Sequence, residues 1–180
     1  SGESPSRTNL EIPDAQQDLL KALVKTGKPV VLLLFTGRPL ILNWESEHIP
    51  SILNVWFGGS ETGDAVADVL FGKAVPCGKL TTTFPRSVGQ LPLFYNHLNT
   101  GRPDPDNRVF NRYASNYLDE SNEPLYPFGY GLSYTDFVYG DLQLSSETLP
   151  KNGNLTASVT VTNKGNHDGY ETVQIYLRDI

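Results

Sequence analysis

The chain has 180 residues, a formal net charge of −6 and no cluster of lysines or arginines. Its length suits one domain and part of a second, since domains most often span roughly 100–150 residues. The acidic balance argues against a nucleic-acid partner, and no stretch of about 20 apolar residues predicts a membrane span. The single cysteine, Cys77, has no disulfide partner and no metal-ligand companion, so packing is its expected role.

The first third of the chain predicts a helix followed by two strands. Residues 13–27 predict an amphipathic helix with proline in its first turn and glycine at its end, its apolar residues being Ala15, Leu19, Leu20 and Leu23. Residues 28–37 contain six consecutive apolar residues, which is typical of a strand buried on both faces of a parallel sheet. Residues 51–57 predict a second such strand. We therefore expect a parallel sheet with crossover helices.

A glycine turn leads from the second strand into another predicted helix. Residues 58–64 read GGSETGD, and the helix extends to Gly72 with Ser60 as a plausible N-cap. Glycines at such a turn also suit a phosphate-binding loop, but the GKS or GKT ending and the GxGxxG spacing are both missing. The tight strand-to-helix turn is the favoured interpretation. With a short strand predicted at residues 79–84, the pattern indicates a layered α/β domain.

The second half of the chain changes character twice. Residues 85–133 are rich in proline, glycine and tyrosine with little periodicity, and their many aromatics predict an ordered loop. From about Thr135, apolar residues alternate with polar ones over 155–161 and 173–177, which predicts half-buried antiparallel strands. Turns are expected at Asn152-Gly153 and Lys164-Gly165.

Alternating strands of this kind suggest a β-sandwich, but only three or four strands fit before Ile180. A sandwich of the immunoglobulin or fibronectin type needs roughly seven strands and about 100 residues. The predicted α/β part is also short of strands, because none precedes its first helix. We therefore expect both ends to be breaks within a larger protein. On this expectation, a signal peptide is not to be looked for at residue 1.

Four stretches resemble the carboxyl-terminal half of glycoside hydrolase family 3, in particular its bacterial β-glucosidases. They are GESPSRTNLEIP (2–13), GKPVVLLLFTGRPL (27–40), WFGGSETGDAVADVLFGKAVPCGKLTTTFPRSVGQLP (56–92) and PLYPFGYGLSYT (124–135). The first is moderately specific and the last two are strong, and their order and spacing add to the match. The resemblance covers essentially the whole chain.

The resemblance implies a retaining exo-glycosidase with an amino-terminal TIM-like barrel, an α/β sandwich domain and a fibronectin type III-like domain. Residues 1–134 would be the carboxyl-terminal part of the sandwich domain, and residues 135–180 would begin the fibronectin type III-like domain. The barrel, which carries the aspartate nucleophile in this family, would lie outside this chain. The implied substrate is a terminal β-glucoside or oligosaccharide, with no cofactor or metal, a periplasmic or secreted location, and a homodimer as an option.

Glu3 is the catalytic residue that the resemblance assigns. In the family the acid/base glutamate sits on a sandwich-domain loop that reaches over the barrel, in local text similar to Ser1-Gly2-Glu3. Gly2, Ser4 and Pro5 are compatible with a loop, and loops can project a side chain into another domain's pocket. To act as an acid at neutral pH, such a glutamate needs its pKa raised from about 4.3 to roughly 6–7. By sequence alone, a loop glutamate is more often a solvated surface charge.

Three further sets of residues were weighed as ligand contacts. The aromatic residues can stack on sugar rings, but packing is the favoured interpretation for most of them: Trp44, Trp56, Tyr126, Phe128 and Tyr130. For the histidines a structural role is favoured still more strongly, since none has a partner at ligand spacing: His48, His97 and His167. A long polar loop could reach an active site, its own or that of a dimer mate, through Asn96, Asn99 and Arg102.

Other functions remain open at this point. A β-xylosidase or another exo-glycosidase of the same family would share these motifs, because the specificity pocket lies mostly in the barrel. A non-catalytic carbohydrate-binding or interaction module fits the chain if no barrel accompanies it, whereas a nucleotide-binding flavodoxin-like domain is disfavoured by the missing phosphate loop. The isolated chain is expected to be inactive and, with apolar sheet edges exposed, poorly soluble.

Overall fold

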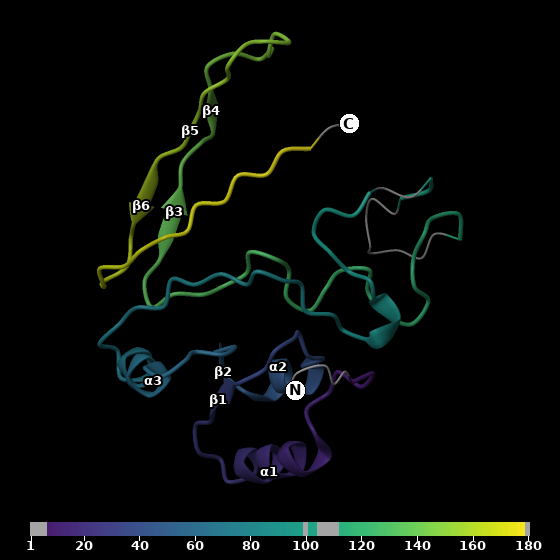
Figure 1. The fold of residues 1–180 in the computed structure, drawn as a ribbon, viewed down its shortest axis with the longest axis vertical. Helices are drawn as coiled ribbons and strands as arrows, with labels where there is room; N and C mark the ends of the chain where they lie inside the picture. Colours follow the sequence, from purple (N-terminus) through teal and green to yellow (C-terminus); the bar gives the residue numbers. More distant parts are fainter. Residues whose placement is uncertain (1–6, 99–100, 104–111, 179–180) are drawn as a thin grey trace. The chain divides into compact units, whose positions relative to one another are not determined.

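A computed structural model describes residues 7–98, 101–103 and 112–178 (Figure 1). The chain divides into two compact units. We call the first the α/β unit (residues 1–66 and 80–130) and the second the β unit (residues 67–79 and 131–180). Mixed helices and strands, with a parallel pair in the first unit, confirm the predicted α/β class.

The first predicted helix is present as α1 (Asp14–Val24). Its first amides donate to the Pro13 carbonyl, Asp14 places a carboxylate in the first turn where the helix dipole favours it, and Gly27 adopts a positive φ of 71° after the helix. Leu20 is buried while Leu19 and Leu23 remain exposed. The helix therefore presents a wider apolar stripe than this chain covers.

The two predicted strands form a parallel pair, β1 (Val31–Leu34) and β2 (Ser51–Asn54), joined in register from Val31–Ser51 to Leu34–Asn54. A helix that the sequence pattern did not predict, α2 (Asn43–His48), connects them. At six residues it is too short to show helical periodicity. The prediction that β1 is buried on both faces is wrong for this chain, because Phe35 and Val31 are about half exposed (57% and 47%).

The strand-to-helix turn after β2 has the tight geometry expected of its glycines. Gly59 has a positive φ of 73°, and a side chain on Gly58 would collide with that of Thr62. Helix α3 spans Thr62–Leu70 and therefore begins two residues after Ser60, while Gly72 follows it with a φ of 74°. Trp56 also has a positive φ, of 55°, which is uncommon outside glycine.

The core of the α/β unit lies between these elements. Its buried members are Ile12, Leu34, Leu42 and Phe84, and the residues packed on them are Leu32, Leu40, Trp56, Leu80, Leu125 and Tyr126. The strand predicted at residues 79–84 is not formed as such, because bends at 81–82 interrupt it. Instead, the Leu80 amide donates to the Tyr130 carbonyl at one end of the segment, and Phe84 exchanges backbone hydrogen bonds with Tyr126 at the other.

Gln90 holds the first part of the predicted ordered loop in place. It ends a short 3₁₀ helix, η1 (Val88–Gln90), and is almost fully buried. Its side-chain oxygen accepts from the Arg86 amide at 2.6 Å, and its side-chain nitrogen donates to the Ser121 carbonyl at 2.8 Å. One buried amide thus ties two distant parts of the loop together, which confirms order in this stretch.

The β unit contains two antiparallel pairs. The alternation over residues 155–161 predicted one side of these pairs but not the partner strands within residues 137–144. Strand β3 (Phe137–Tyr139) pairs with β6 (Val161–Asn163), and β4 (Gln143–Leu144) pairs with β5 (Ala157–Ser158). Between the two pairs the first segment has one residue more than the second, so it carries a bulge near residues 140–142. A turn at residues 150–153 is closed by the Gly153 amide donating to the Pro150 carbonyl.

The predicted strand at residues 173–177 is not formed in the part of the chain that the structure describes. Ile175 and Leu177 are 72% and 95% exposed, and the strands β3 to β6 are also mostly exposed rather than half-buried. A strand needs a ladder partner and its apolar face needs a second layer. The sequence pattern is that of a strand, but the described residues offer it neither.

Candidate functional site

Glu3, the predicted acid/base, lies outside the described residues. The description begins at Arg7 and follows the segment that leads from it into α1. This segment ends in the core, where Ile12 is 9% exposed and packs with the cluster around Leu34 and Phe84. The site therefore has to be built from the residues that follow Glu3 and those that hold them.

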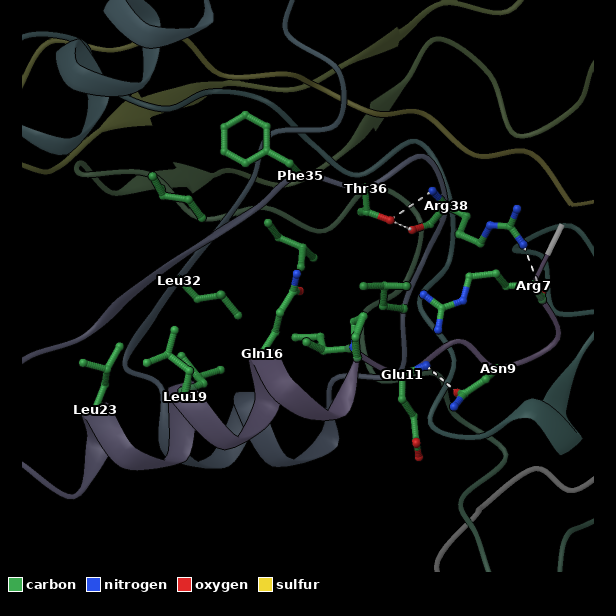
Figure 2. A pocket seen from close by; sticks show the side chains of 16 residues that line it. Arg7, Asn9, Glu11, Gln16, Leu19, Leu23, Leu32, Phe35, Thr36 and Arg38 are labelled. Atoms are coloured by element: carbon green, nitrogen blue, oxygen red, sulfur yellow. Dashed lines mark hydrogen bonds between the residues drawn. The ribbon is translucent and has the colours of Figure 1, made fainter. Parts of the chain in front are cut away.

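A cavity of about 500 Å³ opens between α1, β1 and this segment (Figure 2). One end is apolar and is formed mainly by leucines of α1 and β1, including Leu19, Leu23 and Leu32. The other end is polar and is formed by Arg7, Asn9, Glu11, Thr36 and Arg38. The polar end lies beyond the carboxyl end of β1, the edge at which open parallel sheets usually bind ligands.

Two connections tie the segment 7–12 to the residues that follow β1. Nη1 of Arg38 donates to the Arg7 carbonyl at 3.1 Å, and the Ile41 amide donates to the Leu10 carbonyl at 2.9 Å. The segment is also shaped internally, because the Glu11 amide donates to the Asn9 side chain at 2.8 Å. Its backbone is thus fixed at both ends and in the middle.

Thr36 forms two hydrogen bonds with the backbone of Arg38. Its hydroxyl donates to the Arg38 carbonyl at 2.8 Å and accepts from the Arg38 amide at 3.3 Å. Thr36 is buried (8% exposed), so this turn cannot exchange its bonds freely with water. The guanidinium of Arg38 therefore projects from a turn whose backbone is held on both sides.

The polar end of the cavity does not contain a hydrolytic pair of acids. Retaining glycosidases use two carboxyl groups about 5–5.5 Å apart, and Glu11 is the one carboxylate among the described lining residues. Glu11 is exposed to solvent. Within the described part of the chain, no group of three or more His, Cys, Asp or Glu side chains is placed to hold a metal ion. The cavity is better suited to positioning than to bond cleavage.

Trp44 and Phe128 have packing partners, as predicted. The Trp44 ring stacks on His48 with centroids 4.5 Å apart, and the Lys21 ammonium lies 5.6 Å from the same ring. Phe128 stacks on Tyr95 at 4.4 Å. These contacts account for both rings without a sugar.

Trp56, Tyr126 and Tyr130 belong to an aromatic cluster around Phe84. Trp56 is tilted against Phe84 at 5.9 Å, Tyr126 meets Phe84 edge-on at 6.3 Å, and Tyr130 stacks on Tyr126 at 5.1 Å. Burial, and secondarily the neighbouring Tyr130, raises the pKa of the Tyr126 phenol above its ordinary value of 10.0. The cluster closes the core where the 80–84 and 125–130 segments meet.

The histidines have local structural contacts. His48 Nδ1 lies 2.8 Å from the Trp44 carbonyl, His97 Nδ1 lies 3.3 Å from the Leu98 carbonyl, and the His167 carbonyl accepts from the Asn163 side chain at 2.8 Å. The structural interpretation of these residues fits all three contacts.

The polar loop proposed to reach an active site is described only in part. Asn99 lies outside the described residues, Asn96 is exposed, and the Arg102 carbonyl accepts from the Ser115 amide at 2.8 Å. Its reach toward a site stays a prediction.

The sequence predicted no role for Thr36 and Arg38, although both lie within GKPVVLLLFTGRPL, one of the four stretches that carried the family resemblance.

The family model described as "Glycosyl hydrolase family 3 C-terminal domain" matches residues 1–134. The chain is 55% identical over 178 residues to a periplasmic beta-glucosidase of Salmonella typhimurium, covering 99% of this chain and 23% of that protein. It is 47% identical over 178 residues to a beta-xylosidase of Formosa agariphila, covering 99% of this chain and 24% of that protein.

Solved structures agree with these sequence matches. The crystal structure of a beta-glucosidase from Listeria innocua in complex with glucose superposes with a TM-score of 0.85 and 44% identity, covering 94% of this chain and 23% of that one. The chain thus spans about a quarter of the length of the proteins it matches. None of the described helices is both long and apolar enough to cross a membrane. By these matches, of which the one to the family's carboxyl-terminal domain spans residues 1–134, the chain belongs to glycosyl hydrolase family 3.

Proposed function

We propose that this chain is part of a retaining, exo-acting β-glucosidase that hydrolyses terminal non-reducing β-D-glucosyl residues. The observation that carries the proposal is the match over 99% of the chain, at 55% identity, to a protein named periplasmic beta-glucosidase. Membership of the family supports the reaction class, and the motif around Glu3 supports its place in the reaction.

Glu3 is proposed as the acid/base. In the first step its carboxylic acid protonates the glycosidic oxygen while an aspartate carboxylate from the barrel, outside this chain, attacks the anomeric carbon and the aglycone departs. In the second step the Glu3 carboxylate takes a proton from water, the water oxygen attacks the anomeric carbon, and the aspartate is released. The chain supplies one of the two carboxyl groups, so the isolated 180 residues should not hydrolyse glycosides.

The remaining parts of the proposal concern architecture and location. We propose that residues 135–180 begin a fibronectin type III-like domain, which the antiparallel pairs β3–β6 and β4–β5 support. The proposed boundary at residues 134/135 is supported by the family match, which ends at residue 134. A periplasmic or secreted location is proposed from the periplasmic relative, and a homodimer is proposed from the family resemblance.

Kinetics of the complete enzyme with Glu3→Gln and Glu3→Ala test the role of Glu3. We expect kcat/KM to fall by about 10²–10⁴-fold for aryl glucosides with poor leaving groups, because their departure needs a proton. It should change little for 2,4-dinitrophenyl glucoside, whose leaving group needs none. Azide should raise the turnover of the Glu3→Ala variant and yield β-glucosyl azide, since it attacks the glycosyl-enzyme without general-base help. Wild-type kinetics in both variants would exclude Glu3.

A β-xylosidase is the second candidate function, because the beta-xylosidase of Formosa agariphila matches the same 99% of the chain. Glucosides and xylosides differ by one hydroxymethyl group, so a pocket discriminates between them by steric fit. The ratio of kcat/KM for 4-nitrophenyl β-glucoside and β-xyloside separates the two activities. If the gene encodes no barrel with an aspartate nucleophile, both give way to a non-catalytic carbohydrate-binding or interaction module.

A further inference from the structure

The arginine beyond the end of β1 has a direct connection to the segment that follows Glu3. The Arg38 guanidinium donates to the Arg7 carbonyl at 3.1 Å, across 31 positions of sequence (Figure 2). Arg7 is four residues from Glu3, and a chain of four residues spans at most about 14 Å. Whatever holds Arg7 therefore limits where Glu3 can reach.

The other end of this segment is already fixed by the fold. Ile12 is buried in the core, and the Leu10 carbonyl accepts from the Ile41 amide at 2.9 Å. Arg7, in contrast, is exposed and begins the described part of the segment. Its carbonyl contact with Arg38 is thus the tether nearest to Glu3 among the described residues.

The backbone of Arg38 is held in place by Thr36. Thr36, itself buried, bonds both the carbonyl and the amide of Arg38 at 2.8 and 3.3 Å. A planar guanidinium offers several donors in a rigid fork, whereas a lysine ammonium is a flexible point charge. The arrangement combines a braced backbone with a pre-oriented donor.

We propose that Arg38 is a positioning residue for the glycosidase reaction, which holds the segment after Glu3 so that the acid/base carboxyl meets the glycosidic oxygen. The inference rests on the proposed role of Glu3. Arg38 acts through backbone geometry rather than on the substrate. Small displacements of a catalytic group reduce rates steeply, by as much as about 100-fold for 1 Å.

The test compares Arg38→Met with Arg38→Lys in the complete enzyme. Arg38→Met keeps an unbranched apolar stem and loses every donor, so kcat/KM for phenyl glucoside should fall by about 10- to 100-fold. The value for 2,4-dinitrophenyl glucoside should stay within about twofold, because its cleavage needs no acid. Arg38→Lys should lie between wild type and Arg38→Met. Equal losses on both substrates would overturn the proposal, since they would show a general structural or binding defect.

A double-mutant cycle separates positioning from direct action. If Arg38 acts through Glu3, Arg38→Met added to Glu3→Gln should change kcat/KM for phenyl glucoside by less than about twofold. An undiminished loss in the Glu3→Gln background would show that Arg38 acts independently, and would overturn the inference. If Glu3→Gln itself has no leaving-group dependence, the proposed function of Glu3 fails. If kcat/KM depends on the leaving group in Glu3→Gln but not in Arg38→Met, the proposed role of Glu3 stands and only that of Arg38 fails.

Arg86→Met is the matched control. Its Nε donates to the Glu123 carbonyl at 3.2 Å, so the variant removes the same kind of bond from a different segment. It should leave the leaving-group dependence unchanged. If Arg38→Met reduces folded yield, Thr36→Val provides a second route, because it removes the hydroxyl that braces Arg38. That variant should reduce phenyl glucoside cleavage selectively, by about two- to fivefold; an unselective effect would contradict the proposal.

Discussion

The two compact units of this chain are stabilised in different ways. All of the buried apolar residues in the described part of the chain belong to the α/β unit: Ile12, Leu20, Leu34, Leu42, Ile49, Phe84 and Pro85. In the β unit the one buried residue among those described is Thr135, whose hydroxyl bonds the Asn163 side chain at 2.7 Å. The β unit relies on polar contacts, because the described residues provide no second sheet on which its strands could pack.

The ion pair Lys79–Glu171 illustrates this reliance. The Lys79 ammonium lies 3.3 Å from the Glu171 carboxylate and donates to the Gly131 carbonyl at 2.8 Å. Both side chains are largely buried (16% and 13% exposed). Residues 67–79 are thus joined to residues 131–180 by polar contacts, which include this ion pair and the hydrogen bonds from Tyr134 to the Val69 carbonyl at 3.0 Å and from Thr172 to the Cys77 carbonyl at 3.2 Å.

The largest predicted effect is the loss of a core ring. Phe84→Ala should destabilise the α/β unit by about 3–5 kcal/mol, because the ring is 1% exposed and contacts Trp56 and Tyr126. Ile175→Ala in the β unit, at a 72% exposed position, should change stability by no more than about 0.5 kcal/mol. Hydrogen exchange of the 180-residue chain, followed by mass spectrometry, measures both units at once. Similar effects from both variants would contradict the distinction between the units.

A smaller effect is predicted for the buried ion pair. Lys79→Met leaves Glu171 without its ammonium partner and should lower the protection of the β3–β6 amides by about 1–3 kcal/mol. Lys73→Met is the matched control, because Lys73 pairs with Asp68 at 2.9 Å with 78% and 39% of the side chains exposed. Exposed pairs contribute little, so a change under about 1 kcal/mol is expected. If Lys73→Met were as harmful as Lys79→Met, burial would not explain the contribution of the pair.

The smallest effect concerns pH. Burial and Tyr130 raise the pKa of Tyr126 in the folded protein, so on raising the pH the unfolded chain loses its phenol proton first. Below pH 10.0 the phenol is protonated in both states, and the folded protein has its full stability with respect to this group. As the pH rises from 10.0 through the higher pKa of the folded state, the unfolding free energy falls. Tyr126→Phe should therefore flatten the decline in the urea midpoint above pH 10.0, followed by the fluorescence of Trp44 and Trp56. If the urea midpoint of the variant declined as steeply as that of the wild type, other groups would be responsible for the decline.

The regular elements with strong local signals were predicted well. The helix α1 follows from apolar spacing between Pro13 and Gly27, and the strands β1 and β2 follow from apolar runs bounded by proline and glycine. The helix α2 was missed because its six residues span less than two turns. The segment 80–84 was predicted as a strand, yet its pairing with 126–130 depends on a loop that returns from over 40 residues away. Local patterns carry no information on such returns.

The candidate site shows the same division. The resemblance assigned Glu3 a role from a short motif, but it assigned none to Arg38 or Thr36. The role proposed for them depends on the hydrogen bond from Arg38 to the Arg7 carbonyl, 31 positions away in sequence. A side-chain donor and a backbone carbonyl leave no pattern in a single sequence, because every residue has a carbonyl.

Local chemistry therefore set the helices α1 and α3, the parallel strands and the family of this protein, since each depends on residue types at short spacing. The tertiary structure alone decided which apolar residues are buried, that residues 80–84 pair with 125–130, and that the Arg38 side chain donates to the Arg7 carbonyl. The physical reason is that burial and long-range hydrogen bonds depend on which segments meet after folding. That choice is made by the whole chain and not by any one stretch of it.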